Sequence, residues 1–209
     1  MRNGLLLATL TTLAMAGERL EVGRFSAGDL GGWQERRFHN QTRYTLVRRA
    51  GHRVLRAEAR AGASGLVKAV RVDLQRTPWL NWCWQVVEPL PPLAERTRAG
   101  DDYAARLYLI KKGGLAFWKT RALNYVWSSS QRPGSRWPNA FTGESVTMWA
   151  LRGPKDTGWR CEKRHLPRDW RKAFGRAVDH IDAVALMTDS DNSGRHTVAD
   201  YGDIWFSSD

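Results

Sequence analysis

Hydrophobic residues in this chain alternate with polar ones over short runs. Gly, Asp, Asn and Pro interrupt the runs at a spacing of roughly 8 to 12 residues. Alternation indicates a β-strand with one buried face, because successive side chains of a strand point to opposite faces of the sheet. The strands predicted in this way are residues 20–25, 33–38, 44–49, 53–59, 65–74, 80–87, 104–110, 121–127, 146–151, 158–164, 181–188 and 202–206.

One segment, residues 167–174, has the pattern of a short helix instead. Pro167 suits the first turn, where the missing backbone N–H costs nothing, and Gly175 suits the position just after the last turn. Many short strands with one short helix predict an all-β protein, an antiparallel β-sandwich of the jelly-roll kind. No linker or repeat divides residues 17–209, so we expect them to form a single domain.

The first 16 residues have the layout of a secretory signal peptide. The segment MRNGLLLATLTTLAMA has one early cation, an apolar run and an Ala-x-Ala ending that suits a cleavage site. The apolar run is too short for a membrane span, which takes roughly 20 apolar residues, and no later segment is apolar enough. We therefore expect a secreted or periplasmic protein whose mature chain begins near Gly17. The alternative is a cytosolic protein that starts with a free strand or helix.

The chain carries an excess of positive charge. It has 33 Lys and Arg residues against 21 Asp and Glu residues, a formal net charge of +12 at pH 7. A negatively charged partner is the natural inference, and we expect an envelope polymer rather than nucleic acid. The cations are scattered with no block of five like charges, so a generally basic surface without a functional face is the alternative. The oligomeric state stays open.

Cys83 and Cys161 are the only cysteines. Each lies inside an apolar strand pattern, where a free cysteine behaves as a small core residue, and we expect two buried free thiols. The alternative is a disulfide, which an oxidising compartment would allow and which would stabilise the fold by roughly 4 kcal/mol.

The polar segment 188–206 has two interpretations. Its residues at ligand positions of a twelve-residue calcium loop are Asp189, Asp191, Ser193 and Asp200. Predicted strands flank the loop where an EF-hand has helices, so a calcium ion here would be structural and held in a loop of another kind. We favour a hairpin, in which residues 192–194 form the turn and the aspartates accept hydrogen bonds from nearby backbone N–H groups. We expect no other cofactor.

Two of the 11 tryptophans are hard to place in a core. Trp127 ends a predicted strand, and Trp137 lies in a loop rich in Gly, Pro and Ser. Their indole faces could stack on a sugar ring or an unpaired base, with Asn124, Arg136 and Asn139 supplying polar contacts. Alternatively, the two rings close the end of the sandwich over its core.

Arg106 is a further candidate for ligand binding. In the stretch AARLYLI it alternates with apolar residues that share the opposite face of the strand. The side chain either projects from the sheet or lies in a groove, paired with a carboxylate such as Asp102.

Asp102 and Glu162 are the candidate catalytic carboxylates. A glycosidase needs two of them, one as acid and one as base or nucleophile, and the chain has enough acidic residues for such a pair. The histidines show no metal-binding spacing, and no G-x-S-x-G elbow is present. For Glu162, an ion pair with Arg164 on the same predicted strand is the simpler interpretation.

Seven segments in a fixed order resemble a known bacterial family. ASGLVKAVRVDL, PWLNWCWQV, DDYAARLYL, NYVW, GWRCEKRHLPRDWRKAFG, IDAVALMTDSDNSG and ADYGDIWF occur as in the domain of unknown function 3047, over about residues 20–206. The resemblance implies a secreted or periplasmic protein and supplies no catalytic residues. The ending YGDIWF is also similar to the last strand of galactose-binding-like jelly-roll carbohydrate modules.

We therefore expect a non-catalytic protein that binds carbohydrate or an anionic cell-envelope polymer. A glycan hydrolase with a carboxylate pair and a structural envelope protein are the alternatives.

Overall fold

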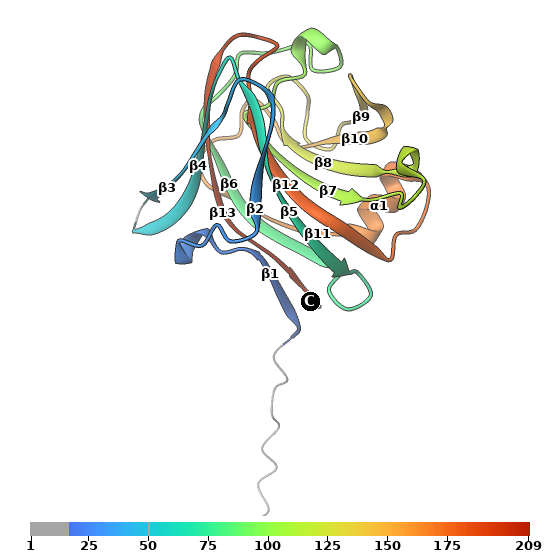
Figure 1. Ribbon diagram of the computed structural model, residues 1–209. Helices are drawn as coiled ribbons and strands as arrows, with labels where there is room; N and C mark the ends of the chain where they lie inside the picture. Colours follow the sequence, from blue (N-terminus) through green and yellow to red (C-terminus); the bar gives the residue numbers. More distant parts are fainter. Residues whose placement is uncertain (1–16, 50) are drawn as a thin grey trace, which may run out of the picture.

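Two β-sheets face each other across an apolar core, as the alternation predicts (Figure 1). The structure is a computed structural model that describes residues 17–49 and 51–209. The expected signal peptide, residues 1–16, lies outside the described residues. Within the described part of the chain, no helix is both long and apolar enough to cross a bilayer.

One sheet has six strands. They are β1 (Arg19–Gly23), β3 (Arg43–Arg49), β4 (His52–Arg60), β6 (Trp79–Glu88), β11 (Arg160–His165) and β13 (His196–Ser207). The order is β11-β6-β13-β4-β3, and β1 pairs with the end of β13 beyond β4. Only the second half of β13 was predicted, because its first half is polar.

The other sheet has seven strands. They are β2 (Trp33–His39), β5 (Ala63–Asp73), β7 (Ala105–Lys111), β8 (Arg121–Trp127), β9 (Arg136–Asn139), β10 (Gly143–Arg152) and β12 (His180–Asp189), in the order β2-β5-β12-β7-β8-β10-β9. The sandwich is antiparallel as predicted, except that β10 runs parallel to β8. The short strand β9 was expected to be loop. Its Pro138 is tolerated because β9 is an edge strand.

The predicted helix is confirmed as α1 (Leu166–Phe174), the only α-helix among the described residues. At its start, His165 Nδ1 accepts a hydrogen bond from the backbone N–H of Arg168 at 3.4 Å. At its end, Gly175 adopts the left-handed conformation with φ +67°, which favours glycine. Short 3₁₀ turns occupy Phe25–Ala27, Arg98–Gly100 and Phe117–Lys119.

Aromatic side chains from both sheets fill the core. Trp82 of β6 stacks on Tyr125 of β8 with ring centroids 5.4 Å apart, and Trp84 packs edge-on against Trp127 at 5.9 Å. Leu166 and Trp170 attach α1 to the same core. Each ring fills a large volume, so truncation of one to alanine would cost about 3–5 kcal/mol.

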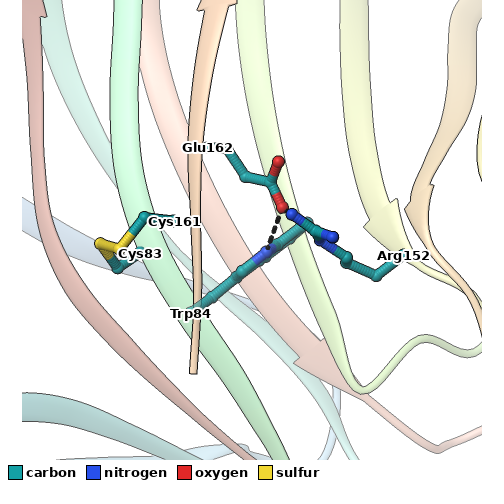
Figure 2. The surroundings of a disulfide bond; sticks show 5 residues. All are labelled: Cys83, Trp84, Arg152, Cys161 and Glu162. Atoms are coloured by element: carbon teal, nitrogen blue, oxygen red, sulfur yellow. Dashed lines mark hydrogen bonds and ion pairs between the residues drawn. A yellow bond between two sulfur atoms is a disulfide. The ribbon is translucent and has the colours of Figure 1, made fainter. Parts of the chain in front are cut away.

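The expectation of free thiols was wrong, because Cys83 and Cys161 form a disulfide (Figure 2). The two residues lie directly opposite each other where β6 pairs with β11. Their side chains are on the outward face of the sheet, since Trp82 and Trp84 on either side of Cys83 point into the core. The apolar pattern of the two strands therefore did not mean that their cysteine side chains point into the core.

The segment 190–195 is a turn, with Gly194 at φ +65°, but it does not close a hairpin. β12 before it belongs to the seven-stranded sheet and β13 after it to the six-stranded sheet. The turn therefore carries the chain from one layer to the other. The expected hairpin was wrong because both strands bury a face against each other across the core instead of pairing edge to edge.

Candidate functional site

A cleft crosses the outer face of the seven-stranded sheet, the face turned away from the core. Along β7, Leu107 and Leu109 point into the core, whereas Arg106, Tyr108 and Ile110 line the cleft. The cleft encloses about 480 Å³ and extends across the strands from β2 to β10. With neighbouring strands roughly 4.8 Å apart, it spans about 24 Å.

Small residues form the floor of the cleft. Ala185 of β12 lies between Val67 of β5 and Tyr108 of β7 in the register of the sheet. In the next row, Gly65 lies beside Met187. Because Gly65 has no side chain and Ala185 a short one, the surface between β5 and β7 is lower than its surroundings.

A small second core closes the other part of the outer face. Tyr103, from the loop before β7, packs on Trp137 of β9 with ring centroids 6.5 Å apart. Val126, Met148 and Ala150 lie in the same cluster. This cluster covers the outer face over β8, so β5, β12 and β7 form the floor of the cleft, and β2 and the segment from the β9–β10 turn to Val146 lie at its two ends.

Aromatic rings lie at both ends and in the middle of the cleft. Phe38 on β2 is 72% exposed, and Phe141 in the turn between β9 and β10 is 50% exposed. Tyr108 lies half-buried between them on β7. Because the three rings line one cleft, they offer three apolar surfaces to one extended molecule.

The polar end of the cleft is built around Arg106. Its Nε donates to Asp189 Oδ1 at 2.8 Å, and its Nη2 contacts the other oxygen of the same carboxylate. Nη2 also donates to the carbonyl oxygen of Asp101 at 3.2 Å. Asn139 Nδ2 donates to both oxygens of the Asp101 carboxylate, at 3.1 and 3.0 Å. These groups are buried and hold one another in place, so they form a preorganised set of donors and acceptors.

Negative charge dominates this end. Asp101, Asp189 and Asp191 line the cleft, and Arg106 is the only cation among the described residues that line it. Burial raises the pKa of Asp101, while Arg106 and Asn139 oppose that shift by stabilising the charged form. Burial and the charge of Asp102 raise the pKa of Asp191. The cleft is therefore unfavourable for an anion and favourable for hydroxyl donors.

Of the predicted ligand-binding residues, Arg106 and Asn139 line this cleft. Arg106 was expected either to project from the sheet or to lie in a groove paired with a carboxylate such as Asp102; it is paired with Asp189 and Asp101. Trp127 and Trp137 are 5% and 4% exposed, so neither offers a ring face to a ligand. Trp127 faces inward on β8 and belongs to the core between the two sheets. Trp137 belongs to the small second core on the outer face, where Tyr103 covers it.

Asn124 and Arg136 are also placed elsewhere. Asn124 is fully buried beneath the outer face, beside Tyr108 and Met148 in the register, and its Nδ2 contacts Met148 Sδ at 3.3 Å. Arg136 lies over the inward-facing ring of Trp149, 4.9 Å from its centroid. Alternation along AARLYLI could have identified Tyr108 as a neighbour of Arg106, whereas Phe38 and Phe141 come from distant segments that only the fold brings to the cleft.

The predicted calcium ligands separate into two groups. Asp189 and Asp191 lie with Asp102 in a cluster whose carboxylate oxygens are within 4.8 Å of one another. Asp200 lies in β13, where Arg56 donates to both its oxygens at 2.8 Å. The four residues therefore do not form a twelve-residue calcium loop. Ser193 contributes its backbone N–H to Asp102 at 2.6 Å, as a donor rather than a ligand.

The three-aspartate cluster fits calcium poorly. Arg106 already occupies both oxygens of Asp189, and Asn192 and Ser193 donate to the two oxygens of Asp102. A cation would compete with a guanidinium and with these N–H groups for the same lone pairs. The cluster instead fixes the 190–195 turn beside the cleft.

The predicted carboxylate pair, Asp102 and Glu162, does not form. Asp102 is fully buried beneath the 190–195 turn. Glu162 lies on β11 of the six-stranded sheet, where it accepts hydrogen bonds from Trp84 Nε1 at 3.1 Å and Arg152 Nε at 2.6 Å (Figure 2). Its ion pair is structural as expected, although the partner is Arg152 rather than Arg164.

The sequence profile of the family described as "Protein of unknown function (DUF3047)" matches residues 31–205. The chain belongs to this family. No curated protein sequence matches this DUF3047 protein at a significant level. The resemblance inferred from the seven segments is thereby confirmed.

Solved structures similar to the DUF3047 chain share its β-sandwich. A thermo-stable cellulase derived from the Cel12A cellulase of Rhodothermus marinus has a TM-score of 0.51 and 11% identity, over 92% of this chain and 100% of that chain. The family 11 carbohydrate-binding module of the cellulase Lic26A-Cel5E of Clostridium thermocellum has a TM-score of 0.48 and 9% identity, over 93% and 95%. At 11% identity, the likeness to the cellulase shows the β-sandwich fold and nothing about the ligand.

Proposed function

We propose that this DUF3047 protein binds a neutral carbohydrate chain in the outer-face cleft, without catalysis. One observation carries the proposal: a cleft across the sheet combines three aromatic rings with buried, mutually fixed polar groups. Rings pack on the carbon–hydrogen faces of sugars, and carboxylate, amide and guanidinium groups pair with hydroxyls. The excess of carboxylates favours an uncharged polymer over an anionic one.

The disulfide supports a secreted or periplasmic location for this activity. Cys83 and Cys161 are joined, and disulfides form and persist mainly in oxidising compartments. The proposed ligand is therefore a polysaccharide that the protein meets outside the cytoplasm.

The proposal is tested by co-sedimentation of the purified protein with insoluble neutral polysaccharides such as cellulose, xylan and β-1,3-glucan. Phe38→Ala and Phe141→Ala should each weaken retention on the bound polymer by roughly three- to tenfold, because each removes one stacking surface. Trp159→Ala is the matched control. Trp159 is 41% exposed and contacts Gly202 on the six-stranded sheet, so its loss should leave retention unchanged.

Unaltered retention of both phenylalanine variants would refute a binding role for the cleft. Absence of retention on every polymer would favour the structural envelope protein instead.

A hydrolase is the second candidate, favoured by the raised pKa values of two carboxylic acids in the cleft, Asp101 and Asp191. A general acid in glycoside hydrolysis must hold its proton near neutral pH, and burial of Asp101 acts in that direction. Release of reducing ends from a retained polysaccharide, abolished in Asp101→Asn, would establish catalysis. Retention with no release would leave binding as the function.

A further inference from the structure

A second pocket lies where α1 ends beside β9 and β10. It encloses about 620 Å³, and none of its lining residues lines the cleft. Four cations line it, Arg121, Arg136, Lys172 and Arg176, together with one carboxylate, Glu144. We call it the basic pocket.

The four cations have no acidic partner among the described residues. Elsewhere in the protein, Arg106, Arg152 and Arg164 each form an ion pair with a buried or half-buried carboxylate. The basic pocket instead concentrates positive charge, with Glu144 as the single acidic residue in its lining. A concave site with one sign of charge attracts a ligand of the other sign.

Two of the guanidinium groups are held in place without losing their charge. Arg121 Nη1 donates to the carbonyl oxygens of Trp118 and Thr120, at 3.0 and 2.9 Å. Arg136 Nη1 donates to the carbonyl oxygen of Lys172 at the end of α1. Carbonyl groups orient a guanidinium but leave its remaining N–H groups free, so the pocket presents positioned donors for an oxyanion.

The remaining lining residues define the class of ligand. Phe174 supplies an apolar wall, and Thr147 and Glu144 supply hydroxyl and carboxylate oxygens. The volume lies in the range of small-molecule sites and exceeds that of a lone oxyanion. A ligand that satisfies this set carries an anionic group for the cations, hydroxyl donors for Glu144 and a carbon–hydrogen face for the ring.

We propose that the basic pocket binds an acidic sugar, a saccharide unit that carries a carboxylate. This site does not depend on the function proposed for the cleft, because the two share no residue and lie on different surfaces of the seven-stranded sheet. The pocket lies on the side of α1, which packs against the core-facing side of the sheet through Trp170, whereas the cleft lies on the outer side.

The experiment is isothermal titration calorimetry with trigalacturonate and with its fully methyl-esterified counterpart. The double variant Lys172→Gln/Arg176→Gln should lose roughly tenfold or more in affinity for trigalacturonate, because it removes two charged donors. Arg168→Gln/Arg171→Gln is the matched control, since it removes the same charge from exposed positions of α1 that do not line the pocket. Phe38→Ala/Phe141→Ala should bind trigalacturonate as the unaltered protein does, which separates this site from the cleft.

Three outcomes would overturn the proposal. These are no binding of trigalacturonate, equal binding of the methyl ester, and an equal loss of affinity in the two double variants. The last of these would mean that the ligand responds to the net charge of the protein rather than to the pocket. All four substituted cations are exposed, so an unchanged melting temperature should confirm that each variant is folded.

Discussion

Arg106 lies on the outer face of β7 with its guanidinium enclosed by the carboxylates of Asp189 and Asp101. Its ring neighbour is Tyr103, whose centroid lies 4.7 Å from the guanidinium carbon. Burial disfavours each of these charges taken singly, and their mutual contacts offset that cost. Arg106 therefore contributes both to the stability of the seven-stranded sheet and to the polar end of the cleft.

Arg106→Met should destabilise the protein by about 3–5 kcal/mol, because it leaves buried carboxylates without a counter-charge. Urea denaturation would measure the loss. Arg195→Met, at an exposed position in the 190–195 turn, should change the free energy of unfolding by no more than about 0.5 kcal/mol. Adding Asp189→Leu to Arg106→Met should recover part of the loss. If the double variant were less stable than Arg106→Met alone, the charge pairing would not be the cause.

Glu58 of β4 gives the protein a specific sensitivity to acid. Hydrogen bonds from Arg43 and Arg60 lower the pKa of this carboxyl from 4.5 to about 2. A lowered pKa in the folded state stabilises the fold above pH 4.5, and this contribution is lost as the pH falls towards 2. Glu58→Gln should therefore lower the melting temperature at pH 6 and reduce its fall between pH 4.5 and 2. A parallel pH profile for the variant and the unaltered protein would contradict this assignment.

At the scale of elements, the pairing of β6 with β11 joins α1, which directly follows β11, to the six-stranded sheet. The disulfide crosses this pair between residues 78 positions apart in the sequence. β11 is the edge strand, so it has a neighbour on one side only. A covalent link is most useful at such a position because fraying of an edge strand would also release α1.

Cys83→Ser/Cys161→Ser should reduce the free energy of unfolding by about 2–5 kcal/mol, since the unlinked unfolded chain gains conformational entropy. Differential scanning calorimetry would measure the shift. A reducing agent should lower the melting temperature of the unaltered protein and leave that of the variant unchanged. Equal sensitivity of both proteins to the reducing agent would argue against the bond as the source of stability.

Over the whole molecule, the net charge of +12 is unevenly distributed. Carboxylates outnumber cations in the cleft, whereas cations outnumber carboxylates in the basic pocket. The net charge of the protein therefore does not predict the charge of the ligand at both the cleft and the basic pocket.

This distribution predicts that salt separates the two binding activities. Retention on a neutral polysaccharide should change by less than about twofold between low and high salt, because uncharged hydroxyls are not screened. Affinity for trigalacturonate should fall steeply over the same range. Salt-dependent retention on the neutral polymer would show that it binds through the general positive field and not through the cleft.

The sequence by itself determined the fold class, the position of α1 and most of the strands. These follow from local rules. Alternation of apolar and polar residues with a period of two marks a strand, and Pro167 and Gly175 mark the two ends of the helix. The family was likewise evident from the order of the seven segments. Strand β9 and the first half of β13 were missed, because short or polar strands owe their pairing to neighbours and not to their own pattern.

Only the tertiary structure decided where the cleft lies and which residues belong to it. Phe38, Tyr108 and Phe141 line one cleft because β2, β7 and the turn after β9 lie along one face of the sheet, and no local sequence pattern encodes that arrangement. The same holds for Trp137, for which the Gly- and Pro-rich context left both a ligand-stacking and a core-covering role open, and which Tyr103 buries. Burial is a property of the partners that a side chain finds, so it follows from long-range packing rather than from the residues beside it in sequence.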